Sequence, residues 1–131
     1  MKFAKAVFWI AGIWGVLVIT PLYFVFDFIG EKSPPAVTHP EFYYGFAIVT
    51  LMWQVAFFVI AADPARYRAL MIPPAIAKTG YAISIAVLVA QGRVAQNQVL
   101  FGIVDFALAI LFLIAFKLAK TGPVERHQHH L

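Results

Sequence analysis

The sequence predicts an all-α integral membrane protein, in which four transmembrane helices form one bundle. Three observations predict this fold class. Of the 131 residues, 63% are hydrophobic and 12% are charged; the mean hydropathy is +0.85; and the apolar residues fall into four long runs. Soluble domains carry about 25% charged residues, and a chain of this length cannot hide so much apolar surface in its own core. We therefore expect a single domain over residues 1–131 that faces lipid.

The four apolar runs cover residues 6–29, 43–62, 69–90 and 99–119. Each run has about 20 residues or more, which is enough to cross a hydrocarbon layer of about 30 Å at 1.5 Å per residue. The segments between the runs hold charges and helix breakers, which predicts loops. The first run is longer than the core of a signal peptide and has no small-residue cleavage site, so we expect it to be retained.

The first two runs contain residues that predict local geometry. Gly12 and Gly15 allow a neighbouring helix to approach closely, and Pro21 predicts a kink because proline removes one backbone hydrogen bond. Ahead of the second run, Thr38 is a suitable N-cap residue and Pro40 suits the first helical turn.

Small and polar residues fall on one face of each of the last three runs. Membrane helices pack through such faces, because lipid supplies no hydrophobic drive between them. These faces contain, run by run, Tyr43, Ala47, Thr50, Gln54, Phe57 and Ala61; Pro74, Lys78, Tyr81 and Ile85; and Gln98, Gly102, Asp105, Ala109 and Phe112.

The basic residues predict the orientation of the chain in the membrane. The first and third loops hold Lys32 and Arg93. The N-terminus, the second loop and the tail hold Lys2, Lys5, Arg66, Arg68, Lys117, Lys120 and Arg126. The positive-inside rule places this larger set, and so both termini, in the cytoplasm, and we expect a bacterial inner membrane protein. Because these residues mark helix ends and form no stripe, we expect no nucleic-acid partner.

Three polar residues lie deep inside the predicted spans: Gln54, Lys78 and Asp105. An ionisable residue at membrane depth costs at least about 2.5 kcal/mol on insertion scales, so it is kept with a partner or for a function. Residue counts from the span ends place Lys78 and Asp105 within roughly 8 Å of each other in depth, which a lysine stem can bridge. We expect an ion pair that either fixes the packing register of two helices or forms part of a binding site.

The binding-site interpretation predicts an apolar cavity that holds the polar head of a ligand. The candidate ligand-binding residues inside it are Lys78, Asp105, Gln54, Tyr81, Thr50, Trp53 and Tyr44. His39 and Glu41 would lie at its outer mouth as acid and base groups. The alternative for these two residues is a capping role at the start of the second span, where Glu41 complements the helix dipole.

Metal and cofactor chemistry have little support in the sequence. The chain has no cysteine, which excludes disulfides, thiolate metal sites and cysteine nucleophiles. The tail at residues 120–131 contains His127, His129 and His130, but no carboxylate or fixed scaffold accompanies them after Arg126. No phosphate loop, nucleophile elbow or zinc helix motif is found in the sequence. We therefore expect no bound metal and no cofactor.

Several segments carry resemblances to known families. The string HPEFYYGFAIVTLMWQVAFFVIAADPARYR over residues 39–68, with PPAIAKTGY and FGIVDFALAILFLIAF, resembles a group of uncharacterised small four-helix bacterial membrane proteins. The size and helix count are similar to those of DoxX-like proteins. A fainter resemblance, to the EXPERA group of sterol isomerases and sigma-2 receptors, rests on Asp27, Gln54, Phe57, Phe58 and Pro74.

The EXPERA resemblance implies that a sterol-like amphiphile binds in a bundle cavity through acidic residues, here Asp27 and Asp105. The second span has Thr50 and no acidic residue, so the resemblance implies a binding mode and not isomerase chemistry. We accordingly expect a protein that binds a lipid, a sterol-like or a quinone-like molecule among membrane lipids. Two alternatives stay open: a structural or accessory subunit that assembles with itself or with another membrane protein, and a membrane enzyme, an isomerase or an oxidoreductase accessory, acting on such a ligand.

Overall fold

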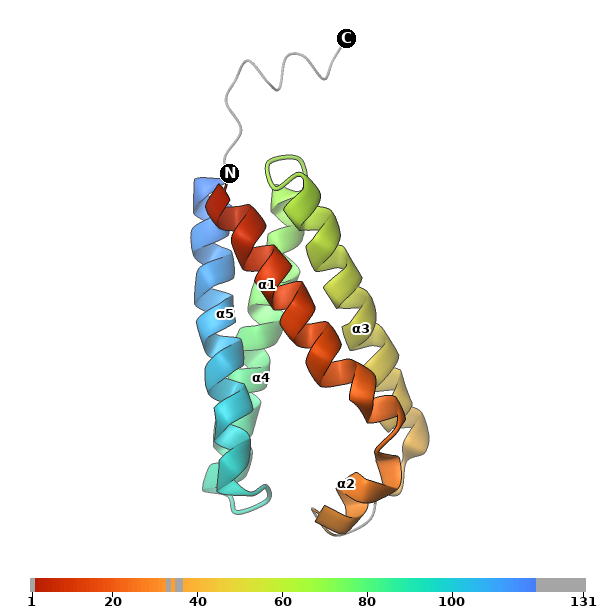
Figure 1. The fold of residues 1–131 in the computed structure, drawn as a ribbon. Coiled ribbons are helices and arrows are strands. Elements are labelled where there is room, and N and C mark those ends of the chain that lie inside the picture. The colour runs from red at the N-terminus through yellow and green to blue at the C-terminus, as the bar shows by residue number, and fades with distance from the viewer. Residues whose placement is uncertain (1, 33, 35–36, 120–131) are drawn as a thin grey trace, which may run out of the picture.

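The computed structural model describes residues 2–32, 34 and 37–119, and all regular elements in these ranges are helical. The α-helices are α1 (Lys2–Ile19), α2 (Phe26–Lys32), α3 (Pro40–Ala62), α4 (Ile72–Ala90) and α5 (Val99–Leu118) (Figure 1). Together with adjoining 3-10 turns, four of them are long and apolar enough to cross a membrane: Lys2–Tyr23, Pro40–Ala62, Arg68–Ala90 and Gln96–Leu118. Each predicted span is therefore present as a helix.

The first span ends earlier than predicted. α1 stops at Ile19, and Pro21 lies in the 3-10 turn η1 (Thr20–Tyr23). The backbone N–H of Phe24 donates to the carbonyl of Pro21 at 2.9 Å, which closes this turn before the separate short helix α2. The expected kink is thus a break, because the proline has no N–H and its ring blocks continuation of the α-helical turn.

The starts of α3 and α4 show how proline fits a first helical turn. His39 is the N-cap of α3 and makes no side-chain capping hydrogen bond, with Pro40 following at the first helical position. The prediction that Thr38 caps this helix was therefore wrong, because the helix begins one residue too late for it. α4 begins at Ile72 and places Pro73 and Pro74 in its first turn, where no helical N–H is lost.

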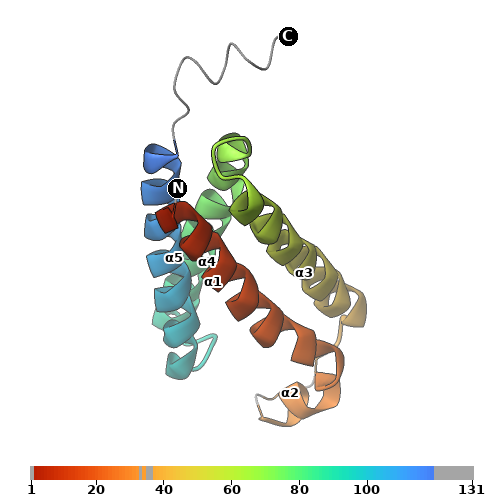
Figure 2. The ribbon, with the colours of Figure 1, turned by 45° about the horizontal axis from the view of Figure 1, so that its top comes forward.

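The helices form two packed pairs that diverge from each other. α1 packs on α3 and α4 packs on α5, while α1 also contacts α5. Although α3 and α4 follow one another in the chain, they make little contact beyond their connecting turn. Figure 2 shows the α1–α3 pair leaning away from the α4–α5 pair toward one end of the molecule. The start of α1, the α3–α4 turn and the end of α5 gather at the opposite end (Figure 1), as the grouping of the basic segments predicts.

The buried apolar cluster of the bundle lies entirely toward this basic end. Its centre is three phenylalanine rings: Phe8 and Phe112 stack with centroids 4.4 Å apart, and Phe57 meets both edge-on. Smaller residues complete the cluster, among them Ala4, Ala61, Met71, Ala75 and Ala115. We call the part of the bundle with this cluster the closed half, and the opposite part, toward α2 and the α4–α5 turn, the open half.

The predicted packing faces are confirmed by burial. Their buried members are Ala47, Gln54, Phe57 and Ala61 on α3, Pro74 and Ile85 on α4, and Gly102, Ala109 and Phe112 on α5. Thr50, Lys78 and Asp105 share these faces but are only partly buried. These three residues lie where the two helix pairs begin to separate, and there they border a cavity.

Candidate functional site

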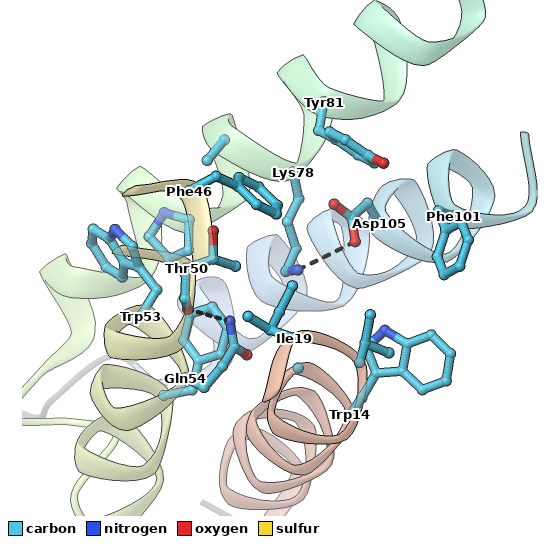
Figure 3. Close-up of a pocket in the computed structure, with 15 residues that line it drawn as sticks. Trp14, Ile19, Phe46, Thr50, Trp53, Gln54, Lys78, Tyr81, Phe101 and Asp105 are labelled. Carbon is cyan, nitrogen blue, oxygen red and sulfur yellow. Dashed lines mark hydrogen bonds and ion pairs between the residues drawn. The ribbon is translucent and has the colours of Figure 1, made fainter. Parts of the chain in front are cut away.

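A cavity of about 220 Å³ lies between the two helix pairs, where the closed half gives way to the open half. All four long helices contribute to its wall, which is mostly apolar (Figure 3). The residues that line it are Trp14, Gly15, Val18 and Ile19 from α1; Phe46, Thr50, Trp53, Gln54 and Phe57 from α3; Pro74, Ala77, Lys78 and Tyr81 from α4; and Phe101 and Asp105 from α5.

The predicted ion pair is present on the α4–α5 side of this cavity. The ammonium Nζ of Lys78 donates to Oδ1 of Asp105 at 3.3 Å, and the side chains are 15% and 22% exposed. Nζ also lies 5.8 Å from the ring centroid of Phe57 and 6.0 Å from that of Phe112. The ammonium therefore sits between a carboxylate and the aromatic faces of the closed half, both of which favour a positive charge.

Gln54 brings a second polar group to the cavity, from α3. The residue is 3% exposed, and its Nε2 donates to the backbone carbonyl of Thr50 at 2.8 Å. This bond fixes the amide orientation, since a carbonyl oxygen can only accept and the donor must face Thr50. The other amide atom, Oε1, is buried and has no hydrogen-bond partner among the described residues.

Gly15 makes room for this amide. A Cβ atom built on Gly15 would overlap Oε1 of Gln54, so any side chain at this position would displace the glutamine. The sequence predicts that a neighbouring helix approaches closely at Gly15. The structure shows that the space at Gly15 holds the side chain of Gln54, the one buried polar side chain among the described residues.

Six of the ten predicted binding residues line the cavity: Lys78, Asp105, Gln54, Tyr81, Thr50 and Trp53. Tyr44 lies further along α3, in an aromatic cluster with Tyr23, Phe26 and Tyr43. In that cluster the Tyr43 hydroxyl donates to the carbonyl of Leu22 at 2.7 Å, which ties α3 to η1. Tyr44 thus belongs to the packing of the open end and not to the cavity wall.

The remaining predicted residues also lie away from the cavity. His39 Nδ1 and Glu41 Oε1 are 3.7 Å apart, and both side chains are 67% exposed at the start of α3. Asp27 is exposed on α2, beside Glu31 at a shallow surface depression. The structure therefore separates these acid and base groups from Asp105, because η1 and the N-terminus of α3 end beyond the open mouth of the bundle.

Several wall residues carry no signal in the sequence that would predict them. Trp14, Ile19, Phe46 and Phe101 are large apolar residues in long apolar runs, where composition does not distinguish a cavity wall from a lipid-facing surface. Trp14 lies one residue before Gly15 on α1, about 100° away around the helix, so the close-approach glycine does not indicate its position either.

The cavity combines a mostly apolar wall with a few side chains that can form hydrogen bonds to a ligand. Lys78 retains two further N–H donors, Asp105 a second carboxylate oxygen, and Tyr81 a hydroxyl. Among the described residues no group of three or more histidine, aspartate or glutamate side chains could hold a metal. The tail histidines His127, His129 and His130 lie outside the described residues.

Comparisons of the chain with protein-family models, with curated proteins and with solved structures find no match. The resemblances to small bacterial membrane proteins, to DoxX-like proteins and to the EXPERA group therefore rest on the quoted residues alone. What the structure adds is the coarser description, an all-helical chain with four helices long and apolar enough to span a membrane.

Proposed function

We propose that this chain is an integral membrane protein that binds the polar head of a lipid-soluble amphiphile in the cavity between its helix pairs. The observation that carries the proposal is the meeting of Lys78, Asp105 and Gln54 at one cavity with an otherwise apolar wall. Polar groups at membrane depth are costly, and they are typical of substrate or ligand sites. A lipid, a sterol-like or a quinone-like molecule supplies both the apolar body and the polar head that such a wall accepts.

The position of the ion pair favours a ligand role over helix registration alone. A pair that only fixed the register would need no open space beside it, since its partner and the neighbouring side chains could satisfy each charge. Lys78 and Asp105 instead line a cavity, and both side chains remain partly exposed. Catalysis is not part of the proposal, because His39 and Glu41 lie outside the cavity wall.

We place the basic end in the cytoplasm of a bacterial cell and the open half toward the outer leaflet. Reporter fusions at the N-terminus and near Arg66 should then be active as cytoplasmic reporters, and fusions near Lys32 and Arg93 as external ones. An external signal from the Arg66 fusion would reverse the orientation and, with it, the leaflet from which a ligand enters.

The binding proposal is tested by filling the cavity. Ala77 on α4 lines it, whereas Ala86 is an exposed residue of the same helix that does not. The two positions are nine residues apart, which is two and a half turns, so they lie on opposite faces. We expect gently purified wild-type protein and the Ala86→Phe variant to carry the same amphiphile in native mass spectrometry and lipid extraction.

The Ala77→Phe variant should lose that amphiphile while retaining its helical circular dichroism. Equal retention by all three proteins would place the bound lipid on the outer surface and remove the support for a binding cavity. A structural or accessory subunit would then be the better description, and it predicts a partner that co-purifies with both variants.

A further inference from the structure

The basic end of the bundle carries positive charge that no acidic side chain offsets. Neither of the two ion pairs found in the described part of the chain lies at this end. The one acidic residue described there, Asp63, accepts a hydrogen bond from the backbone N–H of Arg66 at 3.4 Å. The basic residues described there are Lys2, Lys5, Arg66, Arg68 and Lys117. Their charge is therefore available to an anion from outside the chain.

Arg68 is held in one orientation at this end, between α4 and α5. Its Nε donates to the carbonyl of Phe116 at 2.6 Å, and its guanidinium carbon lies 3.7 Å from the centroid of the Phe116 ring. Arg68 itself begins the 3-10 turn η2 (Arg68–Met71), which leads into α4. A guanidinium has five N–H donors, so the Nη1 and Nη2 groups remain for another acceptor. The side chain is thus ordered before a ligand arrives.

A phosphate group matches this arrangement. Two N–H groups of one guanidinium can bind two phosphate oxygens in parallel. A guanidinium that already stacks on an aromatic ring loses little further freedom when it does so. Lys117 follows Phe116 directly on α5 and is exposed, so it adds a second positive charge close to Arg68.

The place of these residues in the spans identifies the source of the phosphate. Arg68 is the first residue of the span Arg68–Ala90, and Phe116 lies two residues before the end of the span Gln96–Leu118. The guanidinium therefore lies where apolar spans meet the polar layer of a membrane, at the depth of lipid phosphates. Basic sites between helices on the cytoplasmic side are typical of anionic lipid recognition.

We infer that Arg68, together with Arg66 and Lys117, binds the phosphate of an anionic phospholipid at the cytoplasmic end of the α4–α5 pair. This site is separate from the cavity, and it rests only on the membrane insertion and orientation proposed above. Phosphatidylglycerol is a simple probe of this class, because it carries one phosphate and a net negative charge. In phosphatidylcholine the same phosphate is accompanied by a cation, which a basic site repels.

A second basic residue of this end shows what a purely structural role looks like. Nζ of Lys5 donates to the carbonyls of Ala61 and Ala62 at 3.2 and 3.1 Å, and so places a positive charge at the C-terminus of α3. Arg68 makes a comparable bond near the C-terminus of α5. If capping were its whole role, loss of Arg68 would lower stability equally in every lipid. The lipid site instead predicts a change in lipid preference.

Lipid retention by the full-length protein tests the site. Phosphatidylglycerol and phosphatidylcholine with identical acyl chains are added at the same mole fraction to dodecyl maltoside micelles, and bound lipid is counted by native mass spectrometry. We expect phosphatidylglycerol to be retained about tenfold more than phosphatidylcholine, which is the factor expected when about one or two basic residues meet one anionic head group.

Substitutions then assign the preference to Arg68. Arg68→Gln should reduce it at least about fivefold, whereas Arg93→Gln, which removes an equal charge at the opposite end of the bundle, should leave it unchanged. Arg68→Lys keeps the charge but not the paired N–H geometry, and its preference should lie between those of wild type and Arg68→Gln. If Arg68→Gln does not fold, Arg66→Gln changes an exposed side chain and should still reduce the preference about twofold.

Three outcomes would overturn the inference. Equal retention of the two lipids by wild type would remove the site, and an unchanged preference in a folded Arg68→Gln variant would leave Arg68 as a cap alone. Equal losses in Arg68→Gln and Arg93→Gln would show that the preference follows net charge. If soluble glycerol phosphate at the concentration of the lipid displaces phosphatidylglycerol, the site belongs to a soluble phosphate ester and not to a lipid. The cavity is tested separately by Ala77→Phe, and the orientation by the reporter fusions.

Discussion

The closed and open halves are built from the same four helices but are held together differently. In the closed half, Phe8, Phe57 and Phe112 from three helices share one core, so the two helix pairs are joined through large side chains. In the open half packing is confined to each pair. Gly15 admits Gln54 between α1 and α3, and Gly102 and Ile85 bring α5 against α4.

This difference shows how a small bundle can hold a cavity without losing its fold. Small residues bring the two helices of a pair close together, but they cannot reach across to the other pair. Large aromatic residues can, and the rings that join the two pairs, Phe8, Phe57 and Phe112, lie in the closed half. The aromatic cluster of the open end instead joins α3 to the segment that follows α1. Polar contacts reinforce the basic end, since Lys5 donates to the carbonyls of Ala61 and Ala62 and Arg68 donates to that of Phe116. Stability and binding capacity are thus assigned to different halves.

The largest expected effect comes from removing a ring of the closed half. Phe112→Ala should destabilise the bundle by about 3 to 5 kcal/mol, because it deletes a fully buried aromatic side chain and leaves a cavity between the helix pairs. Phe101→Ala, on the same helix in the open half, should cost about 1 kcal/mol or less, since Phe101 is exposed beside an existing space. Unfolding in mixed detergent micelles measures both values.

Equal losses for Phe112→Ala and Phe101→Ala would contradict the division into halves. Such a result would mean that Phe101 also joins the two helix pairs and that the open half contributes to their association.

A smaller effect is expected at the boundary between the halves, where the ion pair lies. Lys78→Met or Asp105→Asn alone should cost about 2 to 4 kcal/mol. This range is below the roughly 3 to 5 kcal/mol of a fully buried pair because both side chains are partly exposed. The double variant should recover part of the loss, since neither charge is then left unpaired. A double-mutant cycle on unfolding free energies in detergent measures the coupling.

Additive losses in that cycle would show that Lys78 and Asp105 act independently. Recovered stability with loss of the co-purifying amphiphile would assign the pair to ligand binding, while recovered stability with the amphiphile retained would assign it to packing alone.

The sequence was sufficient to predict the elements and much of their packing. Long apolar runs predicted four spans, and small and polar residues at helical spacing predicted the buried faces of α3, α4 and α5. It also predicted the Lys78–Asp105 pair, because charge cost and depth leave few partners for an ion inside a span. These features depend on local periodicity and on the free-energy cost of placing a single charged residue inside a span.

The shape of the cavity could not be predicted in the same way. Whether α3 packs on α4 depends on the angle between two helix pairs, which is set by large side chains such as Phe8 and Phe112 from distant parts of the chain. Apolar residues in a membrane span show no contrast between core and lipid-facing positions, so Phe46 and Phe101 gave no signal. The end of α1 at Ile19 depended on whether Pro21 bends a helix or stops it, and proline permits both.

The smallest predicted effect concerns packing within a pair in the open half, at Gly15 and Gln54. Gly15→Ala should cost about 1 to 3 kcal/mol, because the added methyl group would overlap the Gln54 amide and force it away from α1. Gly80→Ala is the matched control. Nothing lies within 4 Å of a Cβ atom built at Gly80, and alanine there should be neutral or stabilise the helix by up to about 1 kcal/mol.

The reciprocal variant identifies the cause of that loss. In a Gln54→Ala background the obstacle is absent, so Gly15→Ala should cost nothing further and should gain the helix propensity of alanine, as Gly80→Ala does. Unfolding in detergent, followed by circular dichroism, compares the four proteins of this cycle. If Gly15→Ala costs the same in both backgrounds, the glycine is needed for the approach of the α1 and α3 backbones and not for the amide. The position of the buried Gln54 amide beside Gly15 would then follow from the spacing of the two backbones.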